Sequence, residues 1–181
     1  ISMVNERYAL WCEKAVADKD VADELKNMKN DNEAISEAFY KDLEFGTGGL
    51  RGIIGAGTNR MNIYTVGKAS QGLAAYVNSV TEKGSIAVAY DSRIKSDVFA
   101  RTAASIFAAN GIKVYIYEEL MPTPMLSYAV RHFKCDAGIV ITASHNPAKY
   151  NGYKAYGADG CQLCIEAADY VLSIMNKVDI F

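Results

Sequence analysis

The chain has 181 residues, enough for one ordinary domain with a small appendage. Half of the residues are hydrophobic and 22% are charged, so the chain can bury a sizeable core and global disorder is excluded. The formal net charge of -2 gives no electrostatic pull toward nucleic acid or an anionic membrane, and no apolar run reaches the ~18 residues of a membrane span.

The start of the chain is polar and amphipathic, which is not typical of a secretory signal. We therefore expect a cytoplasmic protein without nucleic-acid or membrane partners. The four cysteines are too few and too scattered for a disulfide scaffold. Cys161 and Cys164 form a CxxC pattern, but without a second Cys or His pair this is a weak zinc or redox signal. Two small apolar residues at the start of a helix are the simpler interpretation.

The first forty residues predict helices. Apolar side chains recur at helical spacing in three stretches, from Val4 to Ala15, from Val21 to Met28 and from Ile35 to Phe39. Such stripes usually pack against a neighbouring element. We therefore interpret residues 1–40 as a helical extension that caps the main domain, rather than as a helix that binds a partner.

From residue 43 onward the pattern alternates between strands and helices. Glycines crowd residues 46–57 around a predicted strand from Leu50 to Ile54. Further strands are predicted at 86–90, 112–117 and 137–142, and helices at 66–80, 96–109, 123–133 and 165–175. Ser96 is a candidate cap for the second of these helices. The alternation predicts an α/β fold, namely a three-layer α/β/α sandwich with a mainly parallel, mixed sheet and the N-terminal helical extension.

Two segments are basic and free of acidic residues although the whole chain is slightly acidic. Residues 46–60 contain GTGGLRG and carry Arg51 and Arg60. Residues 142–154 follow the most apolar strand as a polar loop and carry His145, Lys149 and Lys154. Because glycines let backbone N–H groups approach a phosphate and arginine can bind one bidentately, both segments are candidate anion sites. Neither contains a P-loop or a dinucleotide-binding pattern, so a plain turn remains the alternative for GTGGLRG.

Ser144 is the candidate nucleophile of the second segment. The nucleophile pattern GxSxG is absent, and the adjacent His145 is awkwardly placed to accept the proton of Ser144, so a hydrolase triad is not favoured. A serine among cations suits the role of carrying a phosphoryl group of about -1.5 to -2 charges. On the residues alone, a hydroxyl that bonds to the backbone of a turn remains an open alternative.

Together these motifs resemble the α-D-phosphohexomutase superfamily, closest to its phosphoglucomutase/phosphopentomutase branch. TASHNP at 142–147 with NGYK at 151–154 is similar to the family's phosphoserine loop, and GTGGLRG at 46–52 is similar to its N-terminal arginine loop. PTP at 122–124 and YDSR at 90–93 also fit, and the motifs follow the family's order. The combination is specific, whereas each short motif alone is not.

The resemblance implies a four-domain enzyme, and this chain resembles only the first of its four domains. Residues 1–40 would be the helical extension and residues 41–181 domain I, the phosphoserine domain. An acidic loop of the DGDGDR type is absent, as are the sugar and phosphate loops of the later domains. We therefore expect an excised N-terminal fragment, inactive alone, whose partners are a sugar monophosphate and domains II–IV of its own chain.

The resemblance also implies the reaction and the roles of the site residues. A sugar 1-phosphate and a 6-phosphate (or 5-phosphate) would interconvert through a phosphoserine at Ser144 and a bisphosphate intermediate. Mg²⁺ would bind a phosphoryl oxygen on Ser144, its other ligands coming from domain II, and a glucose 1,6-bisphosphate-type molecule would act as activator. The implied catalytic residues are Ser144, His145, Lys154 and Arg51, and the implied phosphate-binding residues are Thr47, Gly48, Gly49, Arg51, Asn146 and Lys154.

Three other functions remain open at this stage. The chain could be a non-catalytic phosphosugar-binding module that keeps the fold, or a phosphatase or kinase that uses Ser144 transiently. Its parent could also act mainly as a phosphopentomutase. Asp91 and Arg93, after a predicted strand, could belong either to the site or to a local structural pair.

Overall fold

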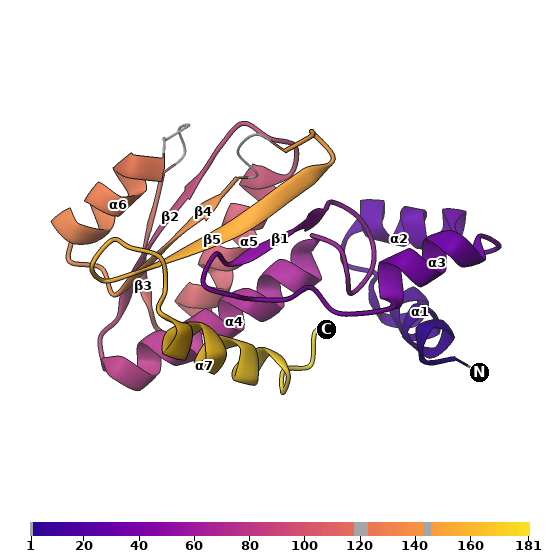
Figure 1. Ribbon diagram of the computed structural model, residues 1–181, viewed down its shortest axis with the longest axis horizontal. Helices are drawn as coiled ribbons and strands as arrows, with labels where there is room; N and C mark the ends of the chain where they lie inside the picture. Colours follow the sequence, from indigo (N-terminus) through magenta and orange to yellow (C-terminus); the bar gives the residue numbers. More distant parts are fainter. Residues whose placement is uncertain (1, 118–122, 143–145) are drawn as a thin grey trace.

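The computed structural model describes residues 2–117, 123–142 and 146–181 (Figure 1). The chain begins with three helices, continues with a strand and a long helix, and then alternates between the two element types. In chain order the elements are α1 (Met3–Lys14), α2 (Lys19–Asn27), α3 (Asn32–Phe39), β1 (Leu50–Ile53), α4 (Ile63–Val80), β2 (Ser85–Tyr90), α5 (Ser96–Ala109), β3 (Lys113–Ile116), α6 (Thr123–His132), β4 (Ala137–Ile141), β5 (Tyr150–Gly157) and α7 (Ile165–Met175).

The five strands form one mixed sheet in the order β1-β5-β4-β2-β3. Strand β2 pairs in parallel with both β3 and β4, whereas β5 runs antiparallel to both β4 and β1. The mixed sheet confirms the predicted fold class. The last five residues of the segment that the sequence indicated to be a polar loop, 150–154, belong to strand β5. The polar residues Asn151 and Lys154 hide the apolar pattern of the buried Tyr153 and Ala155 there.

Helices cover both faces of the sheet and make the predicted three-layer sandwich. On one face α4, α5 and α7 pack over side chains such as Ile86, Ile139 and Tyr153. On the other face Leu126 and Val130 of α6 pack over Ala87 of β2 and Val140 of β4. Gly138 admits α6 closely, since a Cβ there would lie 2.5 Å from Val130 Cγ2. Two cores therefore sandwich the sheet.

The three N-terminal helices form an extension with a core of their own at one end of the molecule, beyond β1 (Figure 1). Trp11 is 2% exposed and makes edge contacts with Phe39, Tyr64 of α4 and Phe181, at ring-centroid distances of 5.7, 5.3 and 5.5 Å. As predicted, these helices pack on the main domain. Among the described residues, no helix combines the length and the hydrophobicity that crossing a bilayer requires.

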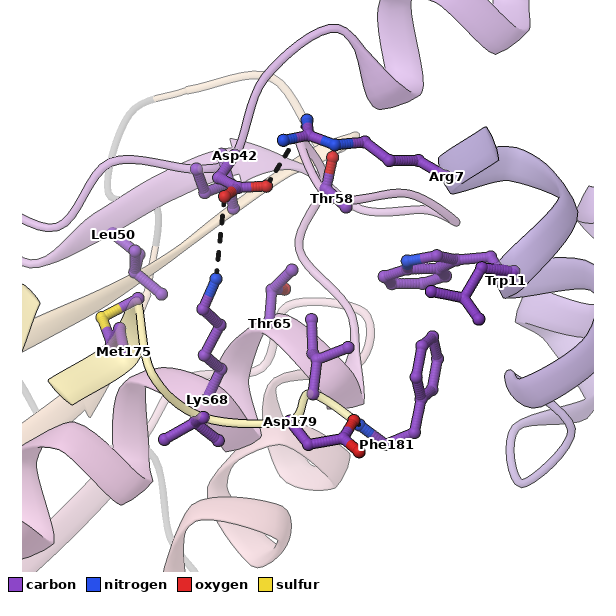
Figure 2. Close-up of a pocket in the computed structure, with 14 residues that line it drawn as sticks. Arg7, Trp11, Asp42, Leu50, Thr58, Thr65, Lys68, Met175, Asp179 and Phe181 are labelled. Carbon is purple, nitrogen blue, oxygen red and sulfur yellow. Dashed lines mark hydrogen bonds and ion pairs between the residues drawn. The ribbon is translucent and has the colours of Figure 1, made fainter. Parts of the chain in front are cut away.

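A hollow of about 310 Å³ separates the extension from the sheet domain (Figure 2). At its upper wall Asp42 pairs with Arg7 of α1 at 3.7 Å and with Lys68 of α4 at 3.8 Å. Leu50 and Met175 line its inner end. This hollow therefore lies on the side of the sheet that α4 and α7 cover, and not on the side that α6 covers.

Candidate functional site

The two predicted anion segments meet on adjacent strands. Arg51 of β1 is paired with Gly152 of β5, and the N–H of Thr142 donates to the carbonyl oxygen of Gly152 at 2.9 Å. Since neighbouring strands lie about 4.8 Å apart, Arg51 and Thr142 are separated by roughly 10 Å across one strand. Thr142, the first residue of the predicted phosphoserine loop at 142–147 (the serine loop), thus lies near Arg51 of the GTGGLRG segment at 46–52 (the glycine loop).

Strand alternation places the two cations of the site on one face of the sheet. Leu50 and Tyr153 point into the core beneath α4, so Arg51, Gly152 and Lys154 face the opposite side. Diagonal neighbours on paired strands lie about 7–8 Å apart, which puts Lys154 within reach of Arg51. Arg51 is exposed and Lys154 is half-buried. This face therefore offers converging positive charge beside the carboxyl end of β4.

Two glycines allow the close approach of the strands. A Cβ on Gly152 would lie 2.7 Å from the carbonyl oxygen of Thr142. Gly49 has a φ of +81°, and a Cβ there would lie 1.8 Å from the carbonyl oxygen of Tyr153. Gly46 and Gly49 exchange two backbone hydrogen bonds of 3.2 and 2.9 Å. The predicted glycine loop is thus a tight turn, with Thr47 and Gly48 exposed at its tip.

A partly buried hydrogen-bond network connects the residues that flank the serine loop. Asp91 Oδ1 accepts from the Arg93 N–H at 2.9 Å and from Ser96 Oγ at 2.8 Å. Arg93 Nη1 donates to the carbonyl oxygen of Pro147 at 3.1 Å. The Asp91 N–H donates to the carbonyl oxygen of Ile141, the last residue of β4, at 3.2 Å. Asp91 and Arg93 therefore tie the turn after β2 to both ends of the serine loop.

Asn151 completes this network from the other side. Its side chain is fully buried, and Nδ2 donates to Ser96 Oγ at 3.0 Å and to the carbonyl oxygen of Ile94 at 3.3 Å. Its Oδ1 accepts from the N–H of Gly152 at 2.8 Å. The predicted capping of α5 by Ser96 is wrong: Lys95 is the capping residue, and the Ser96 hydroxyl bonds to Asp91 and Asn151 instead.

The structure describes most, but not all, of the predicted site residues. Arg51, Lys154 and Gly49 lie on or beside β1 and β5, and Asn146 is half-buried just before β5. Ser144 and His145 lie outside the described residues, so their predicted roles stay predictions. No sequence pattern predicts the network role of Ser96, because only the fold brings it to Asn151, 55 positions further along the chain.

The described residues do not by themselves fit a metal site. Within residues 2–117, 123–142 and 146–181, no group of three or more His, Cys, Asp or Glu side chains is placed to hold an ion. Cys164 directly precedes α7 and both CxxC thiols are exposed and free.

Residues 42–180 match the family model described as phosphoglucomutase/phosphomannomutase, alpha/beta/alpha domain I. The chain belongs to the phosphoglucomutase/phosphomannomutase family. This confirms the resemblance that the loop motifs indicated.

Similar members of the phosphoglucomutase/phosphomannomutase family include curated staphylococcal proteins. A phosphoglucomutase of Staphylococcus haemolyticus (strain JCSC1435) is 43% identical over 148 residues, which cover 80% of this chain and 27% of that protein. A phosphoglucomutase of Staphylococcus aureus (strain USA300) is 40% identical over 169 residues, which cover 93% of this chain and 30% of that protein. The chain thus spans less than a third of the length of these relatives.

Solved structures of the family share the fold. A putative phosphomannomutase from Thermus thermophilus superposes with a TM-score of 0.69 at 32% identity, over 75% of this chain and 30% of that one. A phosphoglucomutase/phosphomannomutase family protein from Burkholderia thailandensis superposes with a TM-score of 0.62 at 21% identity, over 75% of this chain and 29% of that one. It shows likeness of fold alone.

Proposed function

We propose that this chain is the phosphoserine domain of a cytoplasmic phosphoglucomutase/phosphomannomutase-type enzyme. The whole protein would interconvert a sugar 1-phosphate and a 6-phosphate (or 5-phosphate) through a bisphosphate intermediate. The observation that supports this most is the strand register Arg51–Gly152–Thr142, which brings the arginine turn beside the start of the serine loop. Residues 1–40 would form the extension, residues 41–181 domain I, and domains II–IV would lie in the rest of the protein.

The proposed reaction consists of two phosphoryl transfers. In the first, the bond between phosphorus and Ser144 Oγ breaks, Oγ keeps the electron pair, and phosphorus bonds to a sugar hydroxyl oxygen whose proton passes to Lys154. In the second, the other phosphoryl group of the bisphosphate moves to Ser144 Oγ, and Lys154 returns a proton to the freed sugar oxygen. A covalent carrier thus divides one 1,6 shift into two in-line steps.

The remaining residues of the site would bind and orient. Arg51 would bind the oxygens of the transferred group, and backbone N–H groups of Thr47, Gly48 and Gly49 would lie beside the phosphate. His145 would orient the phosphoserine, and Asn146 would shape the loop. Asp91, Arg93 and Asn151 hold the loop's flanks and act through position only. By family membership, Mg²⁺ would bind a phosphoryl oxygen on Ser144 and stabilise negative charge there, and a sugar bisphosphate would act as activator.

The experiment that tests this proposal compares two serine variants of the full-length parent. We expect Ser144→Ala to lower mutase turnover at least on the order of 10³-fold, because it removes the phosphoryl carrier. Ser105→Ala, on the exposed face of α5, is the matched control and should keep parental turnover. Intact-mass measurement should show one phosphoryl group on the parent and none on Ser144→Ala. Unchanged turnover in Ser144→Ala would refute the assignment.

A second assay separates the mutase from a phosphosugar-binding module. Purified residues 1–181 should bind sugar phosphates without sustaining turnover, because the rest of the substrate site would lie outside this chain. A panel of hexose and pentose 1-phosphates, tested on the full-length parent, then identifies the preferred sugar. Steady conversion of glucose 1-phosphate by residues 1–181 would contradict the proposed division of labour.

A further inference from the structure

A second hollow, of about 410 Å³, lies along the edge strand β1. The end of α3 and the following turn form one wall, residues 59–60 form another, and Tyr150 of β5 closes it on the sheet side. Ile53 and Tyr150 are paired across β1 and β5, on the same face of the sheet as Arg51. The hollow is therefore distinct from the one in Figure 2, which faces α4 and α7.

The lining of this hollow is predominantly positive. Lys41, Arg51 and Arg60 come from three separate segments, and Glu44 is the one acid among the lining residues. Arg60 is held in place: its Nη1 donates to the carbonyl oxygens of Glu37 at 3.3 Å and Asn59 at 3.2 Å. The Arg60 Nη2 lies 3.8 Å from Oε2 of the exposed Glu37 carboxylate. Arg60 is thus fixed in position, and its charge is partly offset by Glu37.

The other two cations are available to a ligand. Within the described part of the chain, the Arg51 side chain makes no hydrogen bond or ion pair, and the ammonium of Lys41 contacts only the ring of Tyr40, at 5.6 Å. Two available positive groups that line the same hollow as a third, fixed one favour a multivalent anion over a neutral ligand. A phosphate group has the charge and the number of acceptor oxygens that match them.

Two tyrosines border the cations. Tyr40 is 52% exposed, although exposing an aromatic ring to water is unfavourable. Tyr150 is half-buried and carries the ammonium of Lys149 at 5.5 Å from its ring centre. Ring faces in the same hollow as three cations suit an organic phosphate, whose carbon skeleton can cover the rings.

We propose that this hollow is a second anion site, which binds the phosphate group of a phosphate monoester through Lys41 and Arg51 beside Arg60. The site needs neither Ser144 nor phosphoryl transfer, and so it goes beyond the proposed function. It lies at the outer edge of the sheet, whereas Thr142 lies two strands further in. Because Arg51 borders both places, an anion in the hollow competes with the serine loop for the same guanidinium.

The test is a titration of ¹⁵N-labelled residues 1–181 at constant ionic strength, followed by backbone amide NMR. Inorganic phosphate and glucose 1-phosphate are the probes, in separate arms. We expect saturable shifts at the amides of Lys41, Asn59, Arg60 and Tyr150. Lys41→Gln should weaken binding about five- to tenfold, since it removes one charged contact. Lys83→Gln, an exposed lysine before β2, is the matched control and should bind as the parent does.

Further variants identify the source of the phosphate and keep the two proposals apart. If Tyr40→Ala weakens the binding of glucose 1-phosphate but not that of inorganic phosphate, the organic part of the ligand contacts the ring. If Tyr40→Ala and the parent bind glucose 1-phosphate with equal affinity, the phosphate alone is recognised. Ser144→Ala should leave the shifts unchanged. Shifts confined to residues 142–154, equal affinity of Lys41→Gln and parent, or loss of the shifts in Ser144→Ala would each overturn the second site. None of these three results would contradict the proposed mutase function.

Discussion

Gly49 illustrates how a single residue sets the geometry of the site. Its φ of +81° suits glycine, and a Cβ would lie 1.8 Å from the carbonyl oxygen of Tyr153. We expect Gly49→Ala to lower the free energy of unfolding by roughly 3 kcal/mol, because strain and a backbone clash add. Gly48→Ala, in open space, should cost less than about 1 kcal/mol. Urea unfolding measures both, and equal stabilities would contradict the clash.

Glu24 gives a second prediction for a single residue, concerning pH. Its Oε2 accepts from the N–H of Ala56 at 3.0 Å. Burial raises the pKa of Glu24 above its ordinary value near 4.5, while the Ala56 bond and the charge of Arg60 oppose that rise. Because the folded protein holds this proton more tightly than the unfolded chain, the resulting stabilisation is full below the unfolded pKa and is lost as the pH rises through the folded pKa.

Glu24→Gln removes this titration and leaves an acceptor for Ala56. We expect the variant to exceed the parent in unfolding free energy at neutral pH, by less than about 1 kcal/mol after solvent screening. The advantage should shrink as the pH falls to about 4. Urea unfolding across this pH range measures the difference in unfolding free energy between Glu24→Gln and the parent. A difference that does not change with pH would show that the titration of Glu24 is not its cause.

At the scale of elements, the start of α5 connects the extension to the serine loop. Lys95 adopts a left-handed φ of 69° at the cap of α5, and its ammonium pairs with Asp20 of α2. The next residue, Ser96, belongs to the network that includes Asp91 and Asn151. The turn between β2 and α5 therefore contacts both the extension and the flank of the serine loop.

Substitutions at Lys95 separate its backbone strain from its ion pair. Lys95→Gly should stay within about 1 kcal/mol of the parent, because glycine adopts this φ freely and an exposed ion pair contributes little. Lys95→Val should cost about 2 kcal/mol, since a branched side chain is strained there. Thermal or urea unfolding measures these values, with Asp20→Asn as the control for the ion pair alone. A glycine variant less stable than the valine variant would exclude this explanation.

For the whole molecule, the docking of the extension depends on an aromatic cluster. Trp11, the single tryptophan of the chain, contacts Phe181, whose ring also lies 5.4 Å from Tyr64. Figure 2 shows Phe181 beside Trp11 at the edge of the hollow. These contacts join the end of the chain to its first helix and to α4.

Phe181→Ala should loosen this junction. We expect a red shift of Trp11 emission, stronger quenching by acrylamide and a loss of about 1–2 kcal/mol in unfolding free energy. Phe133→Ala is the matched control, because Phe133 is also partly exposed but stacks on Tyr115, outside the extension. Parental fluorescence in Phe181→Ala would show that the extension docks without the cluster.

The sequence by itself determined the helical extension, the alternating α/β pattern and the family, because apolar spacing and loop motifs are local properties of the chain. Strand β5 was not predicted, because polar residues interrupt its apolar pattern. Its place in the sheet depends on pairing with β4 and β1, which are distant in the sequence or separated from it by the loop. Tertiary structure alone decided that Arg51 and Lys154 share a face of the sheet. It likewise decided that Asp91 and Asn151 share the Ser96 hydroxyl, and that Lys41 and Arg51 line the same hollow. Each of these contacts depends on the path of the chain between distant residues, and no local spacing encodes that path.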